Sequence, residues 1–283
     1  MRKEEIRSWI KRASSEGWAI GEFNVYNMET MQGVLAAANE LRSPVIIGIT
    51  MGGLAHAGLS YITALCKELR AGADVPLFVH LDHGADFATV RSVIEAGFDS
   101  VMLDVSRLPY EANVEAVRAA AEFAHAAGVG FEAQIGETWD EETGEQRTET
   151  TRPEDLQRFV EATGVDYVAV SFGNTPGRTD GLSEPDLELL LSLLEASPVP
   201  LVMHGGTSIP DSVLRTAIAA GAAKVNIDTH IKRAVNSTLE RAYTGSYSHD
   251  PRVQFRELRE AVKNAVAEKM RLFGSVGKAD APW

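Results

Sequence analysis

Pro76-Leu-Phe-Val-His-Leu-Asp-His-Gly84 is the stretch of sequence that decides the fold. It is short, mostly apolar and followed by a helical pattern, which is typical of a parallel strand buried on both faces. Seven further runs of this kind, each followed by helical spacing, occupy residues 18–24, 44–50, 100–106, 129–136, 167–173, 200–206 and 224–229. Regular alternation of strands and helices predicts a parallel α/β architecture.

Eight such units without a larger interruption favour a closed (β/α)8 barrel, the TIM barrel, over an open doubly wound sheet, which is the second choice. A barrel of this type needs roughly 250 residues. We therefore expect one domain over residues 1–283, nearly the whole 283-residue chain. Residues 250–274 predict one or two further amphipathic helices, which could cap the barrel or contact a second subunit.

Helix boundaries are also marked in the sequence. Glycine follows small or acidic residues just before four of the strands, at positions 97, 128, 164 and 221, where we expect left-handed helix caps. Pro153, Pro185 and Pro210 stand where a first helical turn would begin.

Composition limits the partners and the compartment. The formal net charge is −13, which disfavours nucleic acid and anionic membranes as partners. The amino terminus is charged and lacks a signal core, and no apolar run is long enough to cross a bilayer. Cys66 is the single cysteine, so no intrachain disulfide can form; we expect a buried thiol and a cytoplasmic protein.

Polar residues gather at the carboxyl ends of the predicted strands. In six runs they stand two positions apart, so that both members of a pair point to the same face. Active sites of barrels lie at this rim, and polar residues on every strand there predict a single active site. The pairs are Glu22/Asn24, His80/Asp82, Asp104/Ser106, Glu132/Gln134, Ser171/Gly173 and Asn226/Asp228, while Thr50 and His204 end the other two runs.

Two ligand sites are predicted within this rim. His83 and His204, together with Glu132, could share a divalent metal ion. The loops after the seventh and eighth strands could bind phosphate through backbone N–H groups and hydroxyls, although a plain tight turn is the alternative for the glycine pair. The residues concerned are Gly205, Gly206, Thr207, Ser208, Asn226, Asp228 and Thr229.

Residues 136–152 form the longest segment without periodicity. Loops of this length within compact domains are often lids or binding loops. The polar composition of this segment favours a solvated, disordered loop just as much as a lid or binding loop.

Several segments resemble the class II, metal-dependent ketose-bisphosphate aldolases, which include fructose- and tagatose-bisphosphate aldolases. The resemblance covers almost the whole chain, and the histidine-leucine-aspartate-histidine segment is its most specific part. The matching segments are Gly21-Glu-Phe-Asn-Val25, His80-Leu-Asp-His-Gly84, Ser100-Val-Met-Leu-Asp104, His204-Gly-Gly206, Asn226-Ile-Asp-Thr229, Asp250-Pro-Arg252 and Glu268-Lys-Met-Arg-Leu-Phe-Gly274.

The resemblance implies reversible aldol cleavage of a ketose phosphate or bisphosphate to an aldehyde and a ketone similar to dihydroxyacetone phosphate. It implies Asp82 as the catalytic acid/base, zinc on His83 and His204, and a catalytic glutamate in the loop after the fifth strand, Glu142 or its neighbour Glu141. It also implies a small-molecule sugar phosphate as partner and a homodimer or homotetramer. We add Asn24, Thr50 and Gly177 to the substrate-binding set.

The sequence departs from the family pattern at four positions. Pro176 stands where a third zinc-binding histidine is usual, and Gln134 replaces a glutamate that can approach the metal. Ser208 replaces a glycine of the phosphate loop, and His230 replaces an acidic residue after the eighth strand. We expect Glu132 to serve as the third ligand and the Zn²⁺ or other divalent metal site to be weakened, or even absent.

Two alternatives remain open. A metal-independent aldolase or transaldolase would use a lysine Schiff base, and Lys224 shares the inward parity of Asn226 and Asp228. A non-catalytic, sugar-phosphate-binding paralogue or assembly subunit is the other, although retention of Asp82 argues against it.

Overall fold

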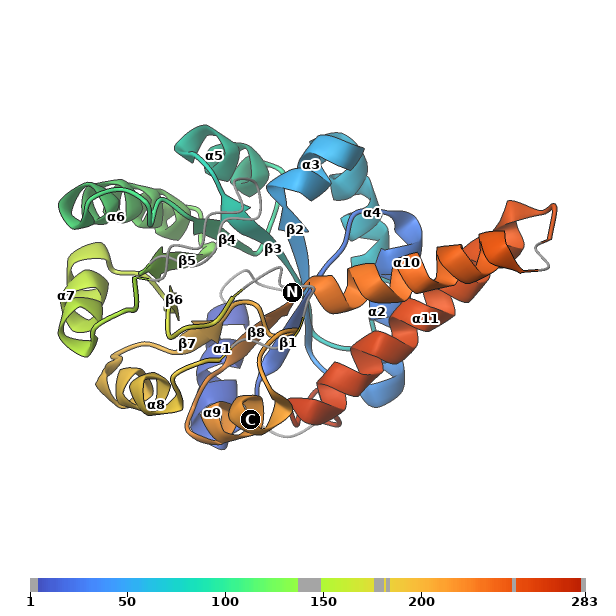
Figure 1. The fold of residues 1–283 in the computed structure, drawn as a ribbon. Coiled ribbons are helices and arrows are strands. Elements are labelled where there is room, and N and C mark those ends of the chain that lie inside the picture. Colours follow the sequence, from blue (N-terminus) through green and yellow to red (C-terminus); the bar gives the residue numbers. More distant parts are fainter. Residues whose placement is uncertain (1–4, 137–148, 176–180, 182–183, 246–247, 281–283) are drawn as a thin grey trace.

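The computed structural model describes residues 5–136, 149–175, 181, 184–245 and 248–280. Eight parallel strands close into a barrel in the order β1 to β8, which confirms the predicted (β/α)8 fold (Figure 1). The strands are β1 (Ile20–Asn24), β2 (Val45–Thr50), β3 (Leu77–Gly84), β4 (Ser100–Leu103), β5 (Gly130–Ile135), β6 (Tyr167–Val170), β7 (Leu201–Met203) and β8 (Lys224–Ile227).

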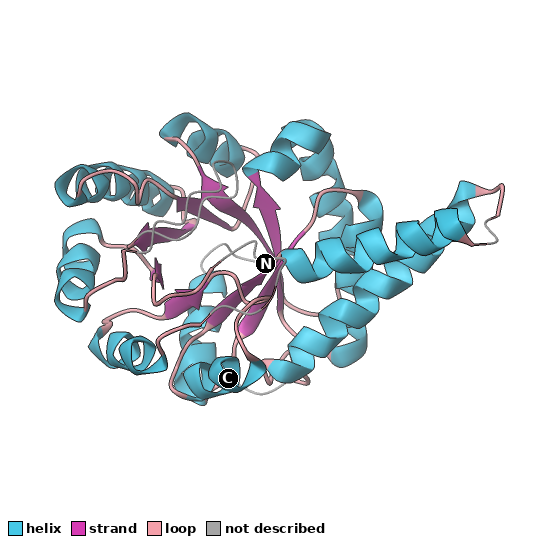
Figure 2. Cartoon of the chain, in the orientation of Figure 1, coloured by secondary structure: helices cyan, strands magenta, loops and turns pink. Residues whose placement is uncertain are grey.

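The helices lie outside the ring of strands, except for the first, which crosses one end of the barrel (Figure 2). They are α1 (Glu5–Glu16), α2 (Met28–Leu41), α3 (Met51–Ala57), α4 (Leu59–Ala71), α5 (Phe87–Glu95), α6 (Tyr110–Ala126), α7 (Pro153–Thr163), α8 (Leu187–Ala196), α9 (Asp211–Ala219), α10 (Thr229–Thr244) and α11 (Pro251–Leu272). Among the described residues, no helix combines the length and apolarity needed to cross a membrane.

Several strands are shorter than predicted. The expected run 167–173 contains β6 only to Val170, and the expected run 100–106 contains β4 only to Leu103. After β6, the N–H of Ser171 donates to Thr151 Oγ1 and that of Phe172 to Asn174 Oδ1. Because side chains accept these backbone donors, the strand ladder ends and the polar residues lie in the loops of the barrel mouth.

The predicted helix boundaries are mostly confirmed. All four predicted capping glycines have positive φ, from 69° at Gly128 and Gly164 to 113° at Gly221. Pro153 is the first residue of α7. The other two predictions were wrong by one or two residues: Pro210 is the N-cap of α9, and Pro185 precedes the N-cap Asp186 of α8, whose carboxylate accepts the N–H of Leu189.

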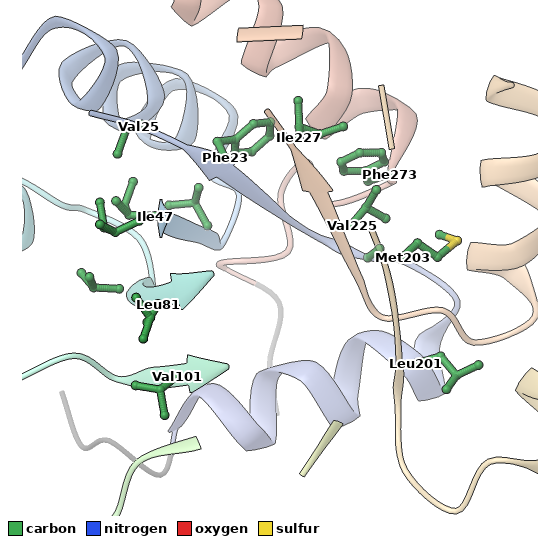
Figure 3. Packing of buried hydrophobic residues seen from close by; sticks show 14 of the residues in the cluster. Phe23, Val25, Ile47, Leu81, Val101, Leu201, Met203, Val225, Ile227 and Phe273 are labelled. Atoms are coloured by element: carbon green, nitrogen blue, oxygen red, sulfur yellow. The ribbon is translucent and has the colours of Figure 1, made fainter. Parts of the chain in front are cut away.

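The outer faces of the strands build the main hydrophobic core against the helices. Phe23 of β1, Val225 and Ile227 of β8, and Phe273 directly after α11 belong to it, and they lie close together in Figure 3. The thiol of Cys66 is buried in this core, as predicted, and burial raises its pKa to about 12. Packing of this kind fixes the strands and therefore the positions of the side chains that point inward.

Helix α1 closes the amino-terminal end of the barrel. Its buried residues Ile6, Trp9 and Ile10 form a second hydrophobic cluster with inward-facing strand residues such as Ile46 and Phe78. The apolar filling therefore occupies the lower barrel, and polar side chains fill the interior above it.

The carboxyl-terminal tail forms a single long helix, α11, that does not cap the barrel. It packs along α2 and α10, and together with α10 it extends away from the barrel (Figure 1). A side chain at Gly33 of α2 would lie 2.8 Å from Val262 and 2.9 Å from the carbonyl of Arg259. The absence of a Cβ at Gly33 permits this close approach of the two helices.

Candidate active site

The end of β3 places two consecutive ionisable residues in the barrel mouth. Successive residues of a regular strand point to opposite faces, so Asp82 and His83 would not normally share one site. Here His83 has a φ of 52°, and the pairing of β3 with β4 shifts register between Leu81 and Gly84. A non-glycine residue in the left-handed region is uncommon and is concentrated at functional sites. This local distortion turns the imidazole of His83 back towards the carboxylate of Asp82.

His83 and His204 meet at the mouth of the barrel. Nε2 of His83 lies 2.8 Å from Nδ1 of His204, and the rings are arranged edge to face with centroids 4.6 Å apart. Oδ1 of Asp82 lies 3.8 Å from the first nitrogen and 3.9 Å from the second. The predicted convergence of these three residues is therefore confirmed by the structure.

A carboxylate stands behind each imidazole. Nδ1 of His83 is 2.6 Å from Oδ2 of Asp104, and Nε2 of His204 is 2.8 Å from Oε1 of Glu132. An ionised carboxylate can only accept, so it holds the ring proton on the nitrogen that faces it. The nitrogens that face each other then carry the lone pairs, and at 2.8 Å they form a hydrogen bond when one of them holds a proton.

This donor set fits a divalent cation. Asp82, His83 and His204 offer ligand atoms that all lie within 4.8 Å of one another. The arrangement of carboxylate, imidazole and metal-facing nitrogen is the usual one for metal-binding histidines. Burial opposes a charge on His83, but Asp82, Asp104 and Glu132 overcome it and raise the pKa of His83 to about 10. The pair is thus surrounded by enough negative charge to hold a cation.

Glu132 occupies a different place from the one predicted. Its Oε1 accepts from His204 and its Oε2 accepts from Lys224 Nζ at 2.9 Å, so both oxygens are used behind the imidazole. In this arrangement both oxygens of Glu132 are engaged behind the imidazole, and among the described residues the ligand atoms that lie within 4.8 Å of one another here are those of Asp82, His83 and His204. The reason is that the ammonium of Lys224 draws the carboxylate into the barrel.

Two amides orient the carboxylate of Asp82. Asn24 Nδ2 of β1 donates to Oδ2 at 2.8 Å, and Asn226 Nδ2 of β8 donates to Oδ1 at 3.1 Å. Burial alone would raise the pKa of Asp82, but the nearby His83, His204 and Lys224 hold it below the ordinary value. The result is a buried, ionised carboxylate fixed beside the imidazole pair, as a general base requires.

A charged layer lies below these groups. Nζ of Lys224 contacts Glu22 Oε2 and Glu132 Oε2, and all three side chains are fully buried. His80 Nε2 lies 3.8 Å from Glu22 Oε2 and 3.6 Å from Glu132 Oε2. Desolvation lowers the pKa of His80 to about 3, with Lys224 as the second cause. The alternation of side chains along the strands predicts that Glu22, His80 and Lys224 point inward. The sequence does not predict that they lie at the same height in the barrel.

The family model described as "Fructose-bisphosphate aldolase class-II" matches residues 4–278. The chain belongs to the class II fructose-bisphosphate aldolases.

Individual relatives agree with this assignment. A fructose-bisphosphate aldolase of Thermus caldophilus is 35% identical over 95% of this chain and 97% of its own, and one of Giardia intestinalis is 32% identical over 97% and 94%. The crystal structure of the YdjI aldolase from Escherichia coli K12 is similar with a TM-score of 0.88 at 33% identity, covering 97% of this chain and 98% of that one. The protein is thus an aldol-cleaving enzyme, an aldehyde-lyase of a zinc-dependent family that acts on sugar phosphates.

The strand-end loops of this class II aldolase lie side by side, as the phosphate-site prediction requires. The N–H of Gly206 donates to Asn226 O, and the N–H of His230 donates to Thr207 Oγ1 at 3.1 Å. A Cβ at Gly206 would lie 2.5 Å from Val225 Cγ1, so the loop after β7 depends on glycine to reach β8. Ser208 is buried, and its Oγ lies 2.9 Å from Thr175 O.

Several residues that the sequence predicts to bind substrate have structural roles in the described fold. Thr50 is the N-cap of α3, where its Oγ1 accepts the N–H of Gly53. Asp228 is the N-cap of α10 and pairs with Lys232 at 2.5 Å, and Thr229 begins that helix and is buried. Gly205 lies in the turn that follows β7, with a φ of 71°.

Other residues predicted for the site fall outside the described part of the chain. These are Glu141 and Glu142 of the loop after β5, and Pro176 and Gly177 after β6. Gln134 is buried at the end of β5, where its Nε2 lies 3.4 Å from Ser106 Oγ and 3.3 Å from Gly136 O.

Proposed function

We propose that this class II aldolase cleaves a phosphorylated ketose reversibly, with Asp82 as the acid/base and a divalent cation on His83 and His204. The products would be an aldehyde and a ketone similar to dihydroxyacetone phosphate. The convergence of the two imidazole nitrogens on Asp82, at distances of 2.8, 3.8 and 3.9 Å, is the observation that carries the proposal.

In the cleavage direction, Asp82 removes the proton from the hydroxyl of the carbinol carbon. That oxygen forms the aldehyde carbonyl, the carbon–carbon bond to the neighbouring ketone fragment breaks, and the electron pair moves towards the ketone oxygen to give an enediolate. The carbon of the enediolate then takes up a proton to give the ketone, and we propose Glu142 as the acid that supplies it. A cation held by His83 and His204 would polarise that ketone carbonyl. The same proton returns from Asp82 in the condensation direction. Asn24 and Asn226 keep the carboxylate in one orientation throughout.

The anionic group of the substrate is assigned to the loops after β7 and β8. The contacts of Gly206 with Asn226 and of Thr207 with His230 support this assignment, because they bring both loops to one edge of the site. Backbone N–H groups and hydroxyls at the amino end of α10 suit an oxyanion. Among the described residues of β8 and α10, Lys224 and Lys232 are both engaged with carboxylates, so the proposal assigns the phosphate contacts of these two loops to neutral donors.

We further propose that the metal site is weaker than in other family members. Pro176 stands where the family resemblance leads us to expect a third histidine, and the group of Asp82, His83 and His204 contains two imidazoles. Protein purified without chelator should contain zinc at less than one equivalent, whereas a full, tightly held equivalent would contradict the proposal. The substitution Pro176→His should raise zinc affinity, with Pro176→Ala as the control for loss of the proline ring.

The Schiff-base alternative is opposed by the surroundings of Lys224. A nucleophilic lysine must be neutral and reach the substrate. Here the ammonium of Lys224 is fully buried between Glu22 and Glu132. Burial lowers the pKa of Lys224, but the neighbouring carboxylates, Glu132 most of all, raise it above the ordinary value. Borohydride treatment in the presence of a keto substrate should leave Lys224 unmodified, and a covalent adduct would support the alternative.

The decisive experiment is a retro-aldol assay on a panel of ketose mono- and bisphosphates, with and without chelator. We expect turnover that a chelator abolishes and added Zn²⁺ restores. Activity insensitive to the chelator would contradict the metal-dependent reaction. Saturable ligand binding without turnover on any member of the panel would instead support a non-catalytic paralogue. Light scattering on the same protein tests the expected homodimer or homotetramer.

A further inference from the structure

Lys224 has a position that aldol chemistry alone does not explain. Its Nζ lies below the barrel mouth and donates to Glu132 Oε2 at 2.9 Å and to Asn226 Oδ1 at 2.8 Å. It also contacts Glu22 Oε2, and the side chain is fully buried. An ammonium has three donors; two of them are hydrogen-bonded to Glu132 and Asn226, and Glu22 is in ionic contact with the same nitrogen.

One of these contacts leads to the metal-binding histidine. The carboxylate of Glu132 spans Lys224 and His204, with Oε2 on the ammonium and Oε1 on the imidazole Nε2 at 2.8 Å. While Glu132 is ionised and held in this orientation, it requires the proton of His204 on Nε2. The lone pair of His204 then lies on Nδ1, the nitrogen that faces His83.

A second contact leads to the general base. An amide side chain can rotate by half a turn and exchange its oxygen and nitrogen. Lys224 can only donate, so it requires the oxygen of Asn226 on its own side. The NH₂ group of Asn226 must then face Asp82, to which it donates at 3.1 Å.

We propose that Lys224 is a positioning residue that sets two choices at once: the tautomer of His204, through Glu132, and the amide orientation of Asn226. This proposal rests on the proposed function, because it concerns the residues that would hold the metal and the general base in that reaction. A merely structural Lys224 would neutralise buried carboxylates without determining which nitrogen of His204 is available to a metal.

The first test uses the wild-type protein without metal. Nitrogen-15 NMR of histidine-labelled protein, with His204 assigned by comparison with a His204→Gln variant, distinguishes a protonated ring nitrogen from one with a lone pair. We expect the proton of His204 on Nε2 and the lone pair on Nδ1. A His204 protonated on Nδ1 in the wild-type protein would overturn the proposal without any variant of Lys224.

The second test removes the ammonium with Lys224→Met. Loss of an outer-shell partner typically lowers metal affinity about 10–100-fold. We expect a reduction of that size in Zn²⁺ affinity, measured by competition with a chromophoric chelator, and a mixture of His204 tautomers in the metal-free protein. Lys263→Met is the matched control, since Lys263 pairs with Glu40 on the outside of the barrel.

Lys224→Met leaves two buried carboxylates without their cation, and folding could suffer. The double variant Glu22→Gln, Lys224→Met replaces both members of the Lys224–Glu22 contact, which proteins tolerate better than removal of one partner. If Lys224 is a positioning residue, the double variant should regain thermal stability, while its zinc affinity should stay low and its His204 tautomers should stay mixed. A folded variant with wild-type tautomer and wild-type zinc affinity would overturn the proposal. Failure of the wild-type protein to cleave any ketose phosphate would instead count against the proposed function, because the tautomer is read without substrate.

Discussion

Nε2 of His83 lies 2.8 Å from Nδ1 of His204, although the two residues are 121 positions apart in the chain. Each ring is held from behind by a carboxylate, His83 by Asp104 and His204 by Glu132. The two carboxylates therefore decide that the facing nitrogens are the ones available to a cation. Predictions about the site can accordingly be made for the supporting residues as well as for the imidazoles.

Removing the charge of Asp104 should weaken metal binding while leaving the imidazole of His83 in place. Asp104→Asn keeps the shape of the side chain, but its amide can present an NH₂ group to Nδ1 of His83. Second-shell changes of this type typically cost about 10–100-fold in metal affinity. Zn²⁺ titration against a chromophoric chelator measures the effect. Glu122→Gln, on the exposed face of α6, is the control, and equal affinities in all three proteins would contradict the assigned role.

Asp82→Asn should separate catalysis from metal binding. The variant retains an oxygen next to the imidazole pair, but an amide cannot accept the substrate proton. Loss of a general base typically lowers turnover by about 10²–10⁴-fold. Steady-state kinetics on the best ketose phosphate, together with zinc content, provides the test. If turnover fell only in proportion to lost zinc, Asp82 would be a ligand alone and the assigned base would be wrong.

Much of this site could be predicted from the sequence because strand parity is strict. Asn24, Asp82 and Asn226 were expected on the inward face and do meet there. The eight apolar runs likewise predicted the eight strands, since parallel strands buried on both faces need continuous apolar sequence.

Other features depend on contacts across the barrel that no local pattern contains. By parity His83 should point away from Asp82, and only the left-handed φ of 52° brings the two together. Glu132 was expected to bind metal, but Lys224 approaches it from β8 and takes one of its oxygens. Such tertiary pairings become visible only when the strands are in register.

Burial of a neutral His80 should make the protein sensitive to acid. Its pKa is about 3 in the folded state, against an ordinary value of 6.5, chiefly because of desolvation. The unfolded chain therefore takes up a proton below pH 6.5 that the folded protein accepts only near pH 3. This contribution to stability is present above pH 6.5 and is lost as the pH falls, at up to roughly 1.4 kcal/mol per pH unit.

His80→Gln removes the titrating group and keeps a polar partner for Ser100, to which His80 Nδ1 is hydrogen-bonded at 2.8 Å. Urea unfolding of the chelated proteins, followed from pH 7 to pH 4, gives the free energy of unfolding of each. We expect the variant to lose less stability than the wild type as the pH falls. Parallel curves would show that His80 does not titrate between the folded and unfolded states.

Gly48 of β2 tests how closely the polar interior is packed. A Cβ at this position would lie 2.3 Å from Oε1 of Glu22 and 2.7 Å from Nδ2 of Asn24. Gly48→Ala should therefore displace both side chains, at a cost of about 1–3 kcal/mol in the free energy of unfolding. Displacement of Asn24 removes a hydrogen bond to Asp82, so turnover should fall further than the loss of folded protein accounts for.

Gly52→Ala is the matched control: Gly52 is exposed on α3, its nearest neighbour would be 3.7 Å away, and alanine at a helical position should stabilise by roughly 0.5–1 kcal/mol. Urea unfolding and steady-state kinetics are measured on both variants. Equal stability and turnover for Gly48→Ala and Gly52→Ala would contradict this prediction, because they would mean that the barrel interior can accommodate the extra methyl group.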